Sequence, residues 1–379
     1  MKGSLLENRR KKTELLAECL GAGALAFLFL FRASVNIWSY SAVLPDSAVF
    51  KTVSMMMRHG FMPYRDSFDH KGPLLYALNY LGDSIAVYRG IWVVELLFMT
   101  VTFLMVYRIA RLTCDRCFAA VAMLVSVSLL FCYFEGGNLV EEYAMPFIAV
   151  ALYIFLDYLE NGVITRGRLV ICGACLGGVL LLRPNMIAVW VVFSLAVLVR
   201  VWKDRQLEKA LTFLLWFLLG AAVMLLPFII WLGARDALKW CWKVYLEFNK
   251  AYISAEGDRA LFRMKWSSFF TFFNNRVVLI AFSVQVYLCI RHRTLKDLAC
   301  LMCLVVSLLL ICLSGERYSH YAMVLVPVIV VPLSGLFALM DDIRMETEAK
   351  KMMRFLVCLF LMCSLVLPDW LTLIGSIPL

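Results

Sequence analysis

The sequence predicts an all-α integral membrane protein, a polytopic helical bundle with about eleven crossings. Of its 379 residues, 63% are hydrophobic and 17% are charged, and the mean hydropathy is +0.83. A soluble domain of this length could not cover that much apolar surface, so lipid is the expected solvent. Two further observations support this class: the apolar residues gather in long runs, and the basic residues lie between those runs.

Eleven apolar runs are long enough, or nearly long enough, to cross a bilayer. The longest stretch, residues 169–199, is interrupted only by Arg183, Pro184 and Asn185. As one helix it would be roughly 46 Å long, against a hydrocarbon core of about 30 Å, so the alternatives are one strongly tilted helix or two short crossings. We expect two crossings. The predicted spans lie near residues 15–37, 91–107, 117–134, 143–159, 169–182, 186–199, 210–233, 277–290, 298–314, 321–340 and 355–374.

The basic residues predict the orientation of these spans. With a cytoplasmic N-terminus and two crossings in 169–199, the inner segments carry 21 Lys and Arg in 63 residues, whereas the outer segments carry 15 in 113. Segments rich in Lys and Arg remain in the cytoplasm, so the sequence predicts a multi-pass cell-membrane protein with its N-terminus inside. The net charge of +10 belongs to this pattern and does not indicate nucleic-acid binding.

The expected domain organisation is a single membrane domain. Residues 1–14 form a basic cytoplasmic tail, residues 15–374 form the transmembrane domain, and no separate soluble domain is expected. The long outer loops 38–90 and 234–276 have room for short helices along the membrane interface. Residues 73–89 have the aromatic, half-polar character of such a helix.

Unusual polar residues gather on the predicted outer face. Asp46 follows the first span, where it would either cap a helix or act as a base. Lys71 precedes Gly72 and Pro73, a helix start whose free N–H groups suit a phosphate, although a lone lysine can also simply extend to water. Arg183 interrupts an apolar run, and an ionisable group at that depth is a functional candidate.

The other candidates are individually less specific. Asp66, Asp69 and His70 could bind a divalent metal, but such residues more often cap a turn, and the set is too sparse to close a structural metal site. Glu141 and Glu142 open a span, where negative charge suits the positive end of a helix. Further supporting residues on the same face are Arg65, Asn185, Arg317 and His320. Several cations with a carboxylate nearby fit an anionic lipid headgroup and a general base.

The stretch from Pro45 to Gly82, PDSAVFKTVSMMMRHGFMPYRDSFDHKGPLLYALNYLG, resembles the first extracytoplasmic loop of GT-C glycosyltransferases. It is similar to the branch that contains the protein O-mannosyltransferases and the lipid A aminoarabinose transferase. In that branch an aspartate follows the first span, a glycine comes later, and Lys-x-Pro-Leu opens an interfacial helix. The residues that match in order and spacing are Asp46, Gly60, Lys71, Pro73 and Leu74.

The resemblance implies a GT-C bundle that moves a sugar from a polyprenyl-phosphate donor to an acceptor hydroxyl of a glycan, lipid or protein outside the membrane. Asp46 would be the base, and Lys71, Arg183 and Arg317 would hold the phosphate. No cofactor is expected to be required, and binding of a divalent metal is left as an open alternative. Ser47 departs from the family pattern, because a second acidic residue is usual there, so a two-carboxylate or metal scheme does not carry over directly.

The main alternative is a transporter or flippase of lipid-linked glycans, which would recognise the same phosphate without chemistry. Transporters often contain paired repeats with a broken helix in each half, whereas this sequence shows one clear break and no repeat. A purely structural membrane protein would leave Asp46 and Lys71 unexplained. The sequence therefore favours the transferase.

Overall fold

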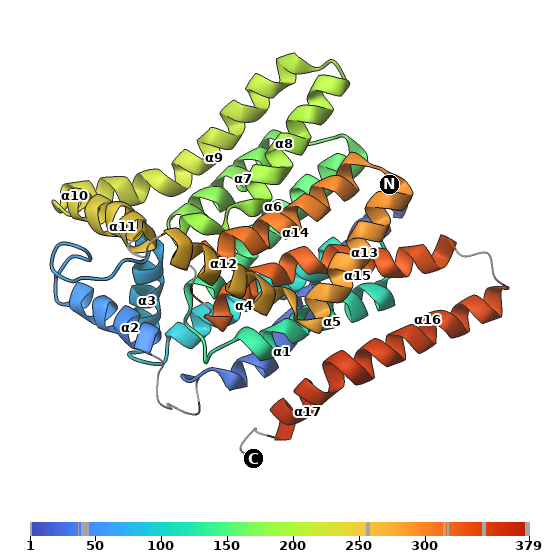
Figure 1. Cartoon of the computed structure of the whole chain (residues 1–379), viewed down its shortest axis with the longest axis horizontal. Helices are drawn as coiled ribbons and strands as arrows, with labels where there is room; N and C mark the ends of the chain where they lie inside the picture. Colours follow the sequence, from blue (N-terminus) through green and yellow to red (C-terminus); the bar gives the residue numbers. More distant parts are fainter. Residues whose placement is uncertain are drawn as a thin grey trace.

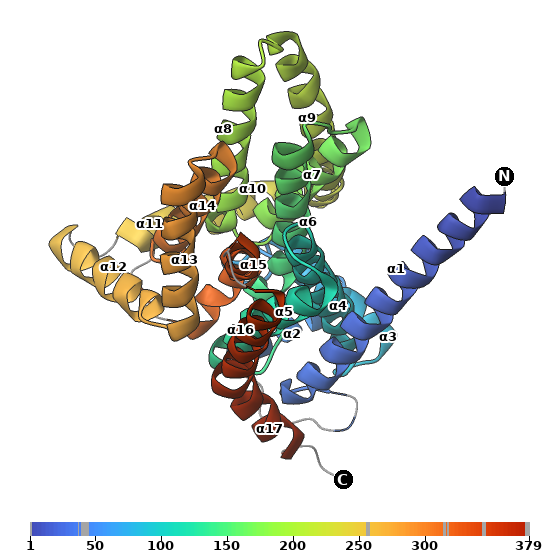
Figure 2. The same ribbon diagram turned by 90° about the vertical axis from the view of Figure 1, so that its right-hand side faces the viewer.

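The computed structural model describes residues 2–36, 38, 45–254, 258–313, 316, 318–342 and 346–375. These residues form a bundle of helices with no strand among them, and Pro63 and Ser67 form an isolated bridge (Figures 1 and 2). The α-helices are α1 (Lys2–Phe29), α2 (Pro45–Arg58), α3 (Pro73–Ile85), α4 (Ile91–Arg111), α5 (Arg116–Tyr133), α6 (Val140–Asn161), α7 (Arg166–Leu180), α8 (Ala188–Lys203), α9 (Leu207–Ala234), α10 (Leu238–Cys241), α11 (Asn249–Ser254), α12 (Asp258–Phe273), α13 (Arg276–His292), α14 (Leu295–Ile311), α15 (Val326–Asp342), α16 (Thr347–Leu361) and α17 (Leu367–Gly375). Short 3-10 helices are η1 (Leu30–Arg32), η2 (Pro184–Met186) and η4 (Ser319–Leu325), and π-helical turns are η3 (Trp242–Phe248) and η5 (Met362–Val366).

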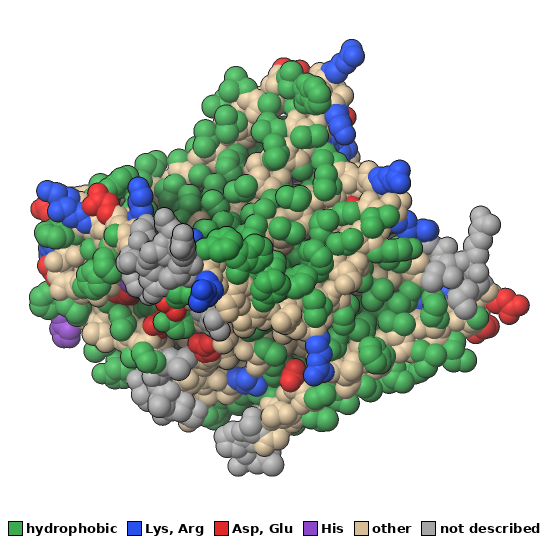
Figure 3. All heavy atoms as spheres, in the orientation of Figure 1, with side chains coloured by type: hydrophobic (Ala, Val, Ile, Leu, Met, Phe, Trp, Pro, Cys, Tyr) green, Lys and Arg blue, Asp and Glu red, His purple; other side chains and the backbone are tan. Residues whose placement is uncertain are grey.

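Each predicted span coincides with one helix or with consecutive helices. Seven helical segments are long and apolar enough to cross a membrane, or eight if α12 and α13, bent by 87°, form one broken span. The shorter helices α7, α8, α13 and α14 have 15 to 17 residues. At 1.5 Å per residue they are roughly 23–26 Å long. The chain is an all-α, multi-pass membrane bundle, and Figure 3 shows apolar side chains over much of the visible face.

The run 169–199 is broken at the predicted position. Pro184 disfavours a helical conformation in the residue before it, and Arg183 is extended, with φ −163° and ψ 116°. Trp190 Nε1 of α8 donates a hydrogen bond to the Cys172 carbonyl of α7 at 3.0 Å. In one continuous helix these residues would be about 27 Å apart, so α7 and α8 fold back as a hairpin.

Contacts between connecting segments define two ends of the bundle. At the first, which we call the cavity end, Ser34 N bonds the Gly136 carbonyl at 2.7 Å, and Gly72 N bonds the Leu182 carbonyl at 3.1 Å. α2, α3 and α10 lie at this end (Figure 1). At the opposite end, acidic and basic residues of neighbouring helices form ion pairs: Arg108 with Glu18, Arg116 with Glu14, Lys296 with Glu160, and Arg354 with Asp115.

Glycines fix the position of α7, which leads into the Arg183 segment. A Cβ on Gly173 would lie 1.8 Å from the Phe217 carbonyl oxygen of α9, and a Cβ on Gly220 would lie 1.9 Å from that of Val170 in α7. Because lipid supplies no hydrophobic force between membrane helices, close approach at small residues is a main source of their packing energy. The α7–α9 contact therefore depends on these two glycines.

Candidate active site

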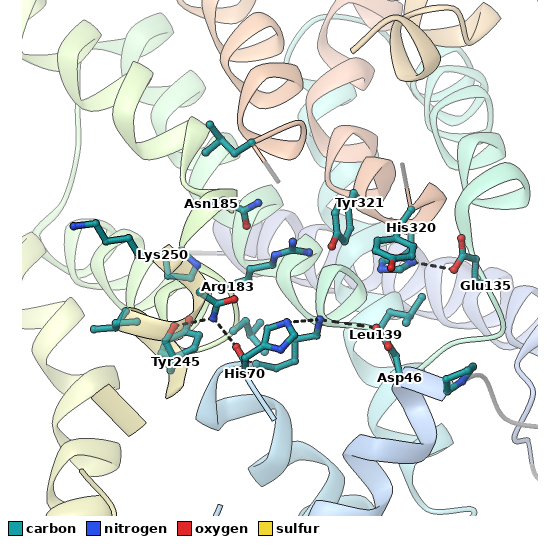
Figure 4. Close-up of a pocket in the computed structure, with 18 residues that line it drawn as sticks. Asp46, His70, Glu135, Leu139, Arg183, Asn185, Tyr245, Lys250, His320 and Tyr321 are labelled. Carbon is teal, nitrogen blue, oxygen red and sulfur yellow. Dashed lines mark hydrogen bonds and ion pairs between the residues drawn. The ribbon is translucent and has the colours of Figure 1, made fainter. Parts of the chain in front are cut away.

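A cavity of about 610 Å³ opens at the cavity end, among α2, η3, α11, η4 and the connecting segments around residues 70, 135 and 183 (Figure 4). Both charged and aromatic side chains line it. They are Pro45, Asp46, His70, Lys71, Glu135, Leu139, Leu182, Arg183, Pro184, Asn185, Tyr245, Leu246, Asn249, Lys250, Leu313, Tyr318, His320 and Tyr321. Of the predicted site residues, six line the cavity: Asp46, His70, Lys71, Arg183, Asn185 and His320.

The segment from His59 to Lys71 is held by its own polar groups. Tyr64 has a left-handed backbone, with φ 69°, and its hydroxyl donates to the Lys71 carbonyl at 2.7 Å. The Asp66 carboxylate accepts from Met62 N at 2.7 Å, and Asp69 accepts from the Tyr76 hydroxyl at 2.9 Å. These bonds use the carboxylates of Asp66 and Asp69 to fix the loop that presents Lys71.

Gly72 brings Lys71 next to the Arg183 segment. Its N–H donates to the Leu182 carbonyl, and Leu74 N donates to the Leu181 carbonyl at 3.1 Å. A Cβ at position 72 would lie 2.0 Å from the Leu181 oxygen, so only glycine permits this approach. Lys71 and Arg183 are 112 positions apart in the sequence, and this backbone contact places both on one cavity.

Lys71 lies between an acid and an imidazole. Its Nζ is 3.9 Å from Asp46 Oδ2 and 3.5 Å from His70 Nε2. Burial, with the nearby Arg183, lowers the pKa of Lys71 below its usual value. Burial and the same cations lower the pKa of His70 to about 4, so this imidazole is neutral at pH 7. An anion in the cavity would favour the charged form of Lys71.

Asp46 is the second residue of α2 and lies in its first turn. A carboxylate there is favoured by the positive end of the helix. The side chain is 49% exposed and faces the cavity, whereas the next residue, Ser47, is buried. Asp46 therefore combines a solvent-accessible carboxylate with a helix that fixes its direction.

Arg183 is held by two partners. Its guanidinium donates to Glu141 Oε1 at 2.7 Å and lies 4.0 Å from the centre of the Tyr321 ring. Glu141 is almost fully buried and Arg183 is 18% exposed, so this is a largely buried pair. Removing one partner of such a pair would leave an uncompensated charge. Glu141 supports Arg183 and does not line the cavity.

A second acid–histidine pair lies on the same cavity. Glu135 Oε2 is 2.9 Å from His320 Nδ1, although the two residues are 185 positions apart. Glu135 lies in the connection between α5 and α6, and His320 lies in η4. Figure 4 shows the pair on the side of the cavity away from His70 and Tyr245.

A buried polar cluster supports α2 from behind. Asn138 Nδ2 donates to Ser47 Oγ and to Asn79 Oδ1, each at 2.9 Å, and Asn138 Oδ1 accepts from the Tyr143 hydroxyl at 2.8 Å. The Asn138 N–H donates to Glu95. We call these residues the Asn138 cluster. It joins α2, α3, α4 and α6 directly behind Asp46.

Three other predicted residues, Arg65, Glu142 and Asn185, each make a polar contact near the cavity. Arg65 pairs with Asp66 at 2.8 Å and donates to the Arg235 carbonyl. At the start of α6, where a negative charge was expected, Glu142 Oε2 accepts a hydrogen bond from the Leu139 N–H at 3.3 Å. Asn185 donates to the Leu310 carbonyl at 3.3 Å. Arg317 lies outside the described residues. Within the part of the chain that the structure describes, no three His, Cys, Asp or Glu side chains are grouped to hold a metal ion.

Several cavity residues were not selected from the sequence. They are Glu135, Tyr245, Asn249, Lys250, Tyr318 and Tyr321. Tyr318 and Tyr321 flank His320 in the sequence YSHY, so their position next to a predicted site residue could have identified them. Asn249 at the start of α11 donates to the His70 carbonyl at 2.8 Å, a contact between distant segments that only folding reveals.

Comparisons with known proteins identify solved structures with a similar fold. ArnT from Cupriavidus metallidurans, solved with undecaprenyl phosphate, is similar over 91% of this chain and 62% of its own, with a TM-score of 0.57 and 14% identity. The oligosaccharyltransferase AglB from Archaeoglobus fulgidus, solved with an inhibitory peptide and a dolichol-phosphate, is similar over 96% of this chain and 56% of its own, with a TM-score of 0.51 and 12% identity.

Both structures are GT-C membrane enzymes, so the GT-C bundle implied by the sequence resemblance is confirmed as the fold. The chain spans less than two thirds of the length of either. No curated protein matches the chain in sequence. Residues 26–371 match one family, so the chain belongs to the family described as "Putative competence-induced protein Ccs4 N-terminal domain".

Proposed function

We propose that this protein is a glycosyltransferase that moves a sugar from a polyprenyl-phosphate donor to an acceptor hydroxyl. The observation that carries the proposal is the meeting of Asp46, Lys71 and Arg183 on one cavity, from three separate elements. The sequence resemblance to the branch of the protein O-mannosyltransferases and the lipid A aminoarabinose transferase supports the same reaction class.

Lys71 and Arg183 are assigned to the donor phosphate. An ammonium and a guanidinium beside a neutral imidazole favour an anion, and both cations are largely buried, where their field is poorly screened. The phosphate is the leaving group of the reaction, so fixed cations stabilise charge that grows during transfer.

Asp46 is assigned as the general base. The acceptor hydroxyl oxygen forms a bond to the anomeric carbon of the donor sugar, and the bond from that carbon to the phosphate oxygen breaks. The electron pair leaves on polyprenyl phosphate, and the hydroxyl proton passes to the Asp46 carboxylate. The Lys71 ammonium lies 3.9 Å from Asp46 Oδ2 and attracts that carboxylate.

The cavity is assigned to the extracytoplasmic face. Basic segments predicted as cytoplasmic contain Arg108, Arg116, Lys296 and Arg354, and these residues form ion pairs at the opposite end of the bundle. The cavity would therefore receive donors whose sugars have already crossed the membrane.

The test is incubation of the purified protein with a panel of polyprenyl-phosphate sugars, with detection of released polyprenyl phosphate. The proposal expects release with at least one donor, and no release by K71M, which removes a phosphate-binding cation. A protein that binds polyprenyl phosphate but releases none from any donor and acceptor would instead be the transporter that the sequence left as the alternative.

A further inference from the structure

The Glu135–His320 pair has the geometry of an orienting carboxylate and a working imidazole. A carboxylate bonded to Nδ1 fixes the ring direction and leaves Nε2 as the second polar atom of the side chain. The His320 side chain is 8% exposed and that of Glu135 is 34% exposed, and both line the cavity. Two polar groups fixed in this way suit recognition of a hydrogen-bonding ligand.

Two tyrosines fix His320 from either side. The Tyr318 ring stacks on the imidazole with centroids 5.7 Å apart and an interplanar angle of 17°, and Tyr321 packs edge-on at 4.9 Å. Tyr318 is also 49% exposed on the cavity wall. Its ring offers an apolar face beside the polar pair, and an aromatic face with adjacent polar groups suits a molecule with both C–H and O–H surfaces.

The cavity has two chemically different sides. The lining cations are Lys71, Arg183 and Lys250. Glu135 adds a carboxylate beside His320, and Figure 4 shows this pair on the side of the cavity away from Lys250. Among the described lining residues, no Lys or Arg accompanies Glu135 in an ion pair; its partner is His320. A phosphate is attracted to the first side, and a carboxylate on the second disfavours another anion.

We propose that Glu135, His320 and Tyr318 form the acceptor subsite, and that this subsite takes a neutral, hydroxyl-bearing sugar rather than a phosphate-bearing acceptor. The inference rests on the proposed function, because that function assigns the opposite side of the cavity to the donor phosphate. Glu135 accepts hydrogen bonds from sugar hydroxyls, His320 orients the attacking one, and Asp46 receives its proton. The sugar ring packs on Tyr318.

The experiment separates binding at the two sides of the cavity. Binding of undecaprenyl phosphate is measured for the wild type, E135Q, H320N and Y318A. Binding of methyl glucoside and methyl N-acetylglucosaminide is then measured by saturation-transfer NMR in the presence of saturating undecaprenyl phosphate. Glucose 6-phosphate is the anionic probe under the same conditions. Matched controls are E160Q, which changes a paired glutamate at the opposite end, and H292N, which changes a histidine paired with Asp297.

We expect the wild type to bind at least one methyl glycoside and to reject glucose 6-phosphate. E135Q removes a charged hydrogen-bond acceptor, and Y318A removes the ring on which the sugar packs. Each should weaken glycoside binding by about ten- to a hundred-fold and leave undecaprenyl phosphate binding unchanged. E135Q keeps an oxygen that can accept from His320, so the contact to η4 survives and only the charge is lost. It should also admit glucose 6-phosphate.

Three results would overturn the subsite: no glycoside binding by the wild type, equal binding of glycoside and sugar phosphate, or parallel loss of glycoside and undecaprenyl phosphate binding in E135Q. The last would show a structural role for the pair. Failure of the proposed function has a different signature, the absence of undecaprenyl phosphate binding by the wild type. In that case, glycoside binding by the wild type and its loss in E135Q still show whether Glu135, His320 and Tyr318 form a sugar-binding subsite.

Discussion

At the scale of single residues, Lys71 is the side chain whose chemistry depends most on its surroundings. It is largely buried, lies 3.9 Å from Asp46, and shares the cavity with Arg183. The sequence predicted its importance because Lys-x-Pro-Leu is a compact local pattern. The Asp46 and His70 contacts on either side of its Nζ could not be predicted, since they depend on how α2 packs on the loop.

The lowered pKa of Lys71 predicts the pH dependence of donor binding. Because its pKa lies below 10.5 in the folded protein, the cation is lost as pH rises, at a lower pH than for an exposed lysine. Undecaprenyl phosphate binding should therefore weaken as pH rises toward 10.5, and K71R should keep its affinity over the same range because arginine stays charged. Titration of affinity against pH measures this. K296R, at the opposite end, should behave like the wild type, and a flat wild-type profile would contradict the assignment.

Ser47 accounts for the departure from the acidic pair expected after Asp46. It is 3% exposed and accepts a hydrogen bond from Asn138, near the buried carboxylates of Glu95 and Glu142. A second acid here would therefore point into the Asn138 cluster and not into the cavity. The sequence alone showed that the acid was missing, and the packing of α2 shows why it is absent.

The prediction is that S47D, which restores an acid, destabilises the protein by several kcal/mol because it buries an unpaired charge. S47A removes one hydrogen bond and should cost about 1 kcal/mol. Thermal unfolding in detergent measures both. If S47D is as stable as S47A, the buried environment assigned to this position is wrong.

At the scale of elements, the site depends on connections between helices that are distant in sequence. The sequence predicted the break in 169–199 because a proline and an arginine interrupt an apolar run. It could not predict that Gly72 packs on the Leu181 carbonyl, nor that η4 brings His320 to Glu135. Both contacts arise from tertiary packing, which leaves no periodic signal in either segment.

Gly72→Ala tests the contact that joins these elements. Its Cβ would lie 2.0 Å from the Leu181 oxygen, so the two segments must separate, at a cost of about 1–3 kcal/mol. Separation of Lys71 from Arg183 should also weaken undecaprenyl phosphate binding. Gly167→Ala is the matched control, because nothing lies within 4 Å of a Cβ there. Equal affinity in the two variants would refute the role of Gly72.

At the scale of the whole molecule, composition determined the class, and the helices agree with the predicted spans. From the charge asymmetry we propose that the cavity end faces the outside of the cell. Cysteine substituted at Ser67 should react with an impermeant reagent in intact cells, whereas cysteine at Asn161, at the opposite end, should react only after lysis. Because the chain has thirteen native cysteines, labelling is compared with the unsubstituted protein. The reverse pattern would invert the topology.

The central claim is that Asp46 performs chemistry on a donor whose phosphate is held by other residues. Turnover and donor affinity of D46N, measured together on a lipid-linked sugar that the wild type uses, test it most directly. Asparagine cannot accept the acceptor proton, so turnover should fall by about a hundred- to ten-thousand-fold. Undecaprenyl phosphate affinity should remain, and unfolding stability should change by less than about 1 kcal/mol, the charge–dipole contribution of a first-turn carboxylate. A D46N variant that turns over the donor at the wild-type rate would contradict the account.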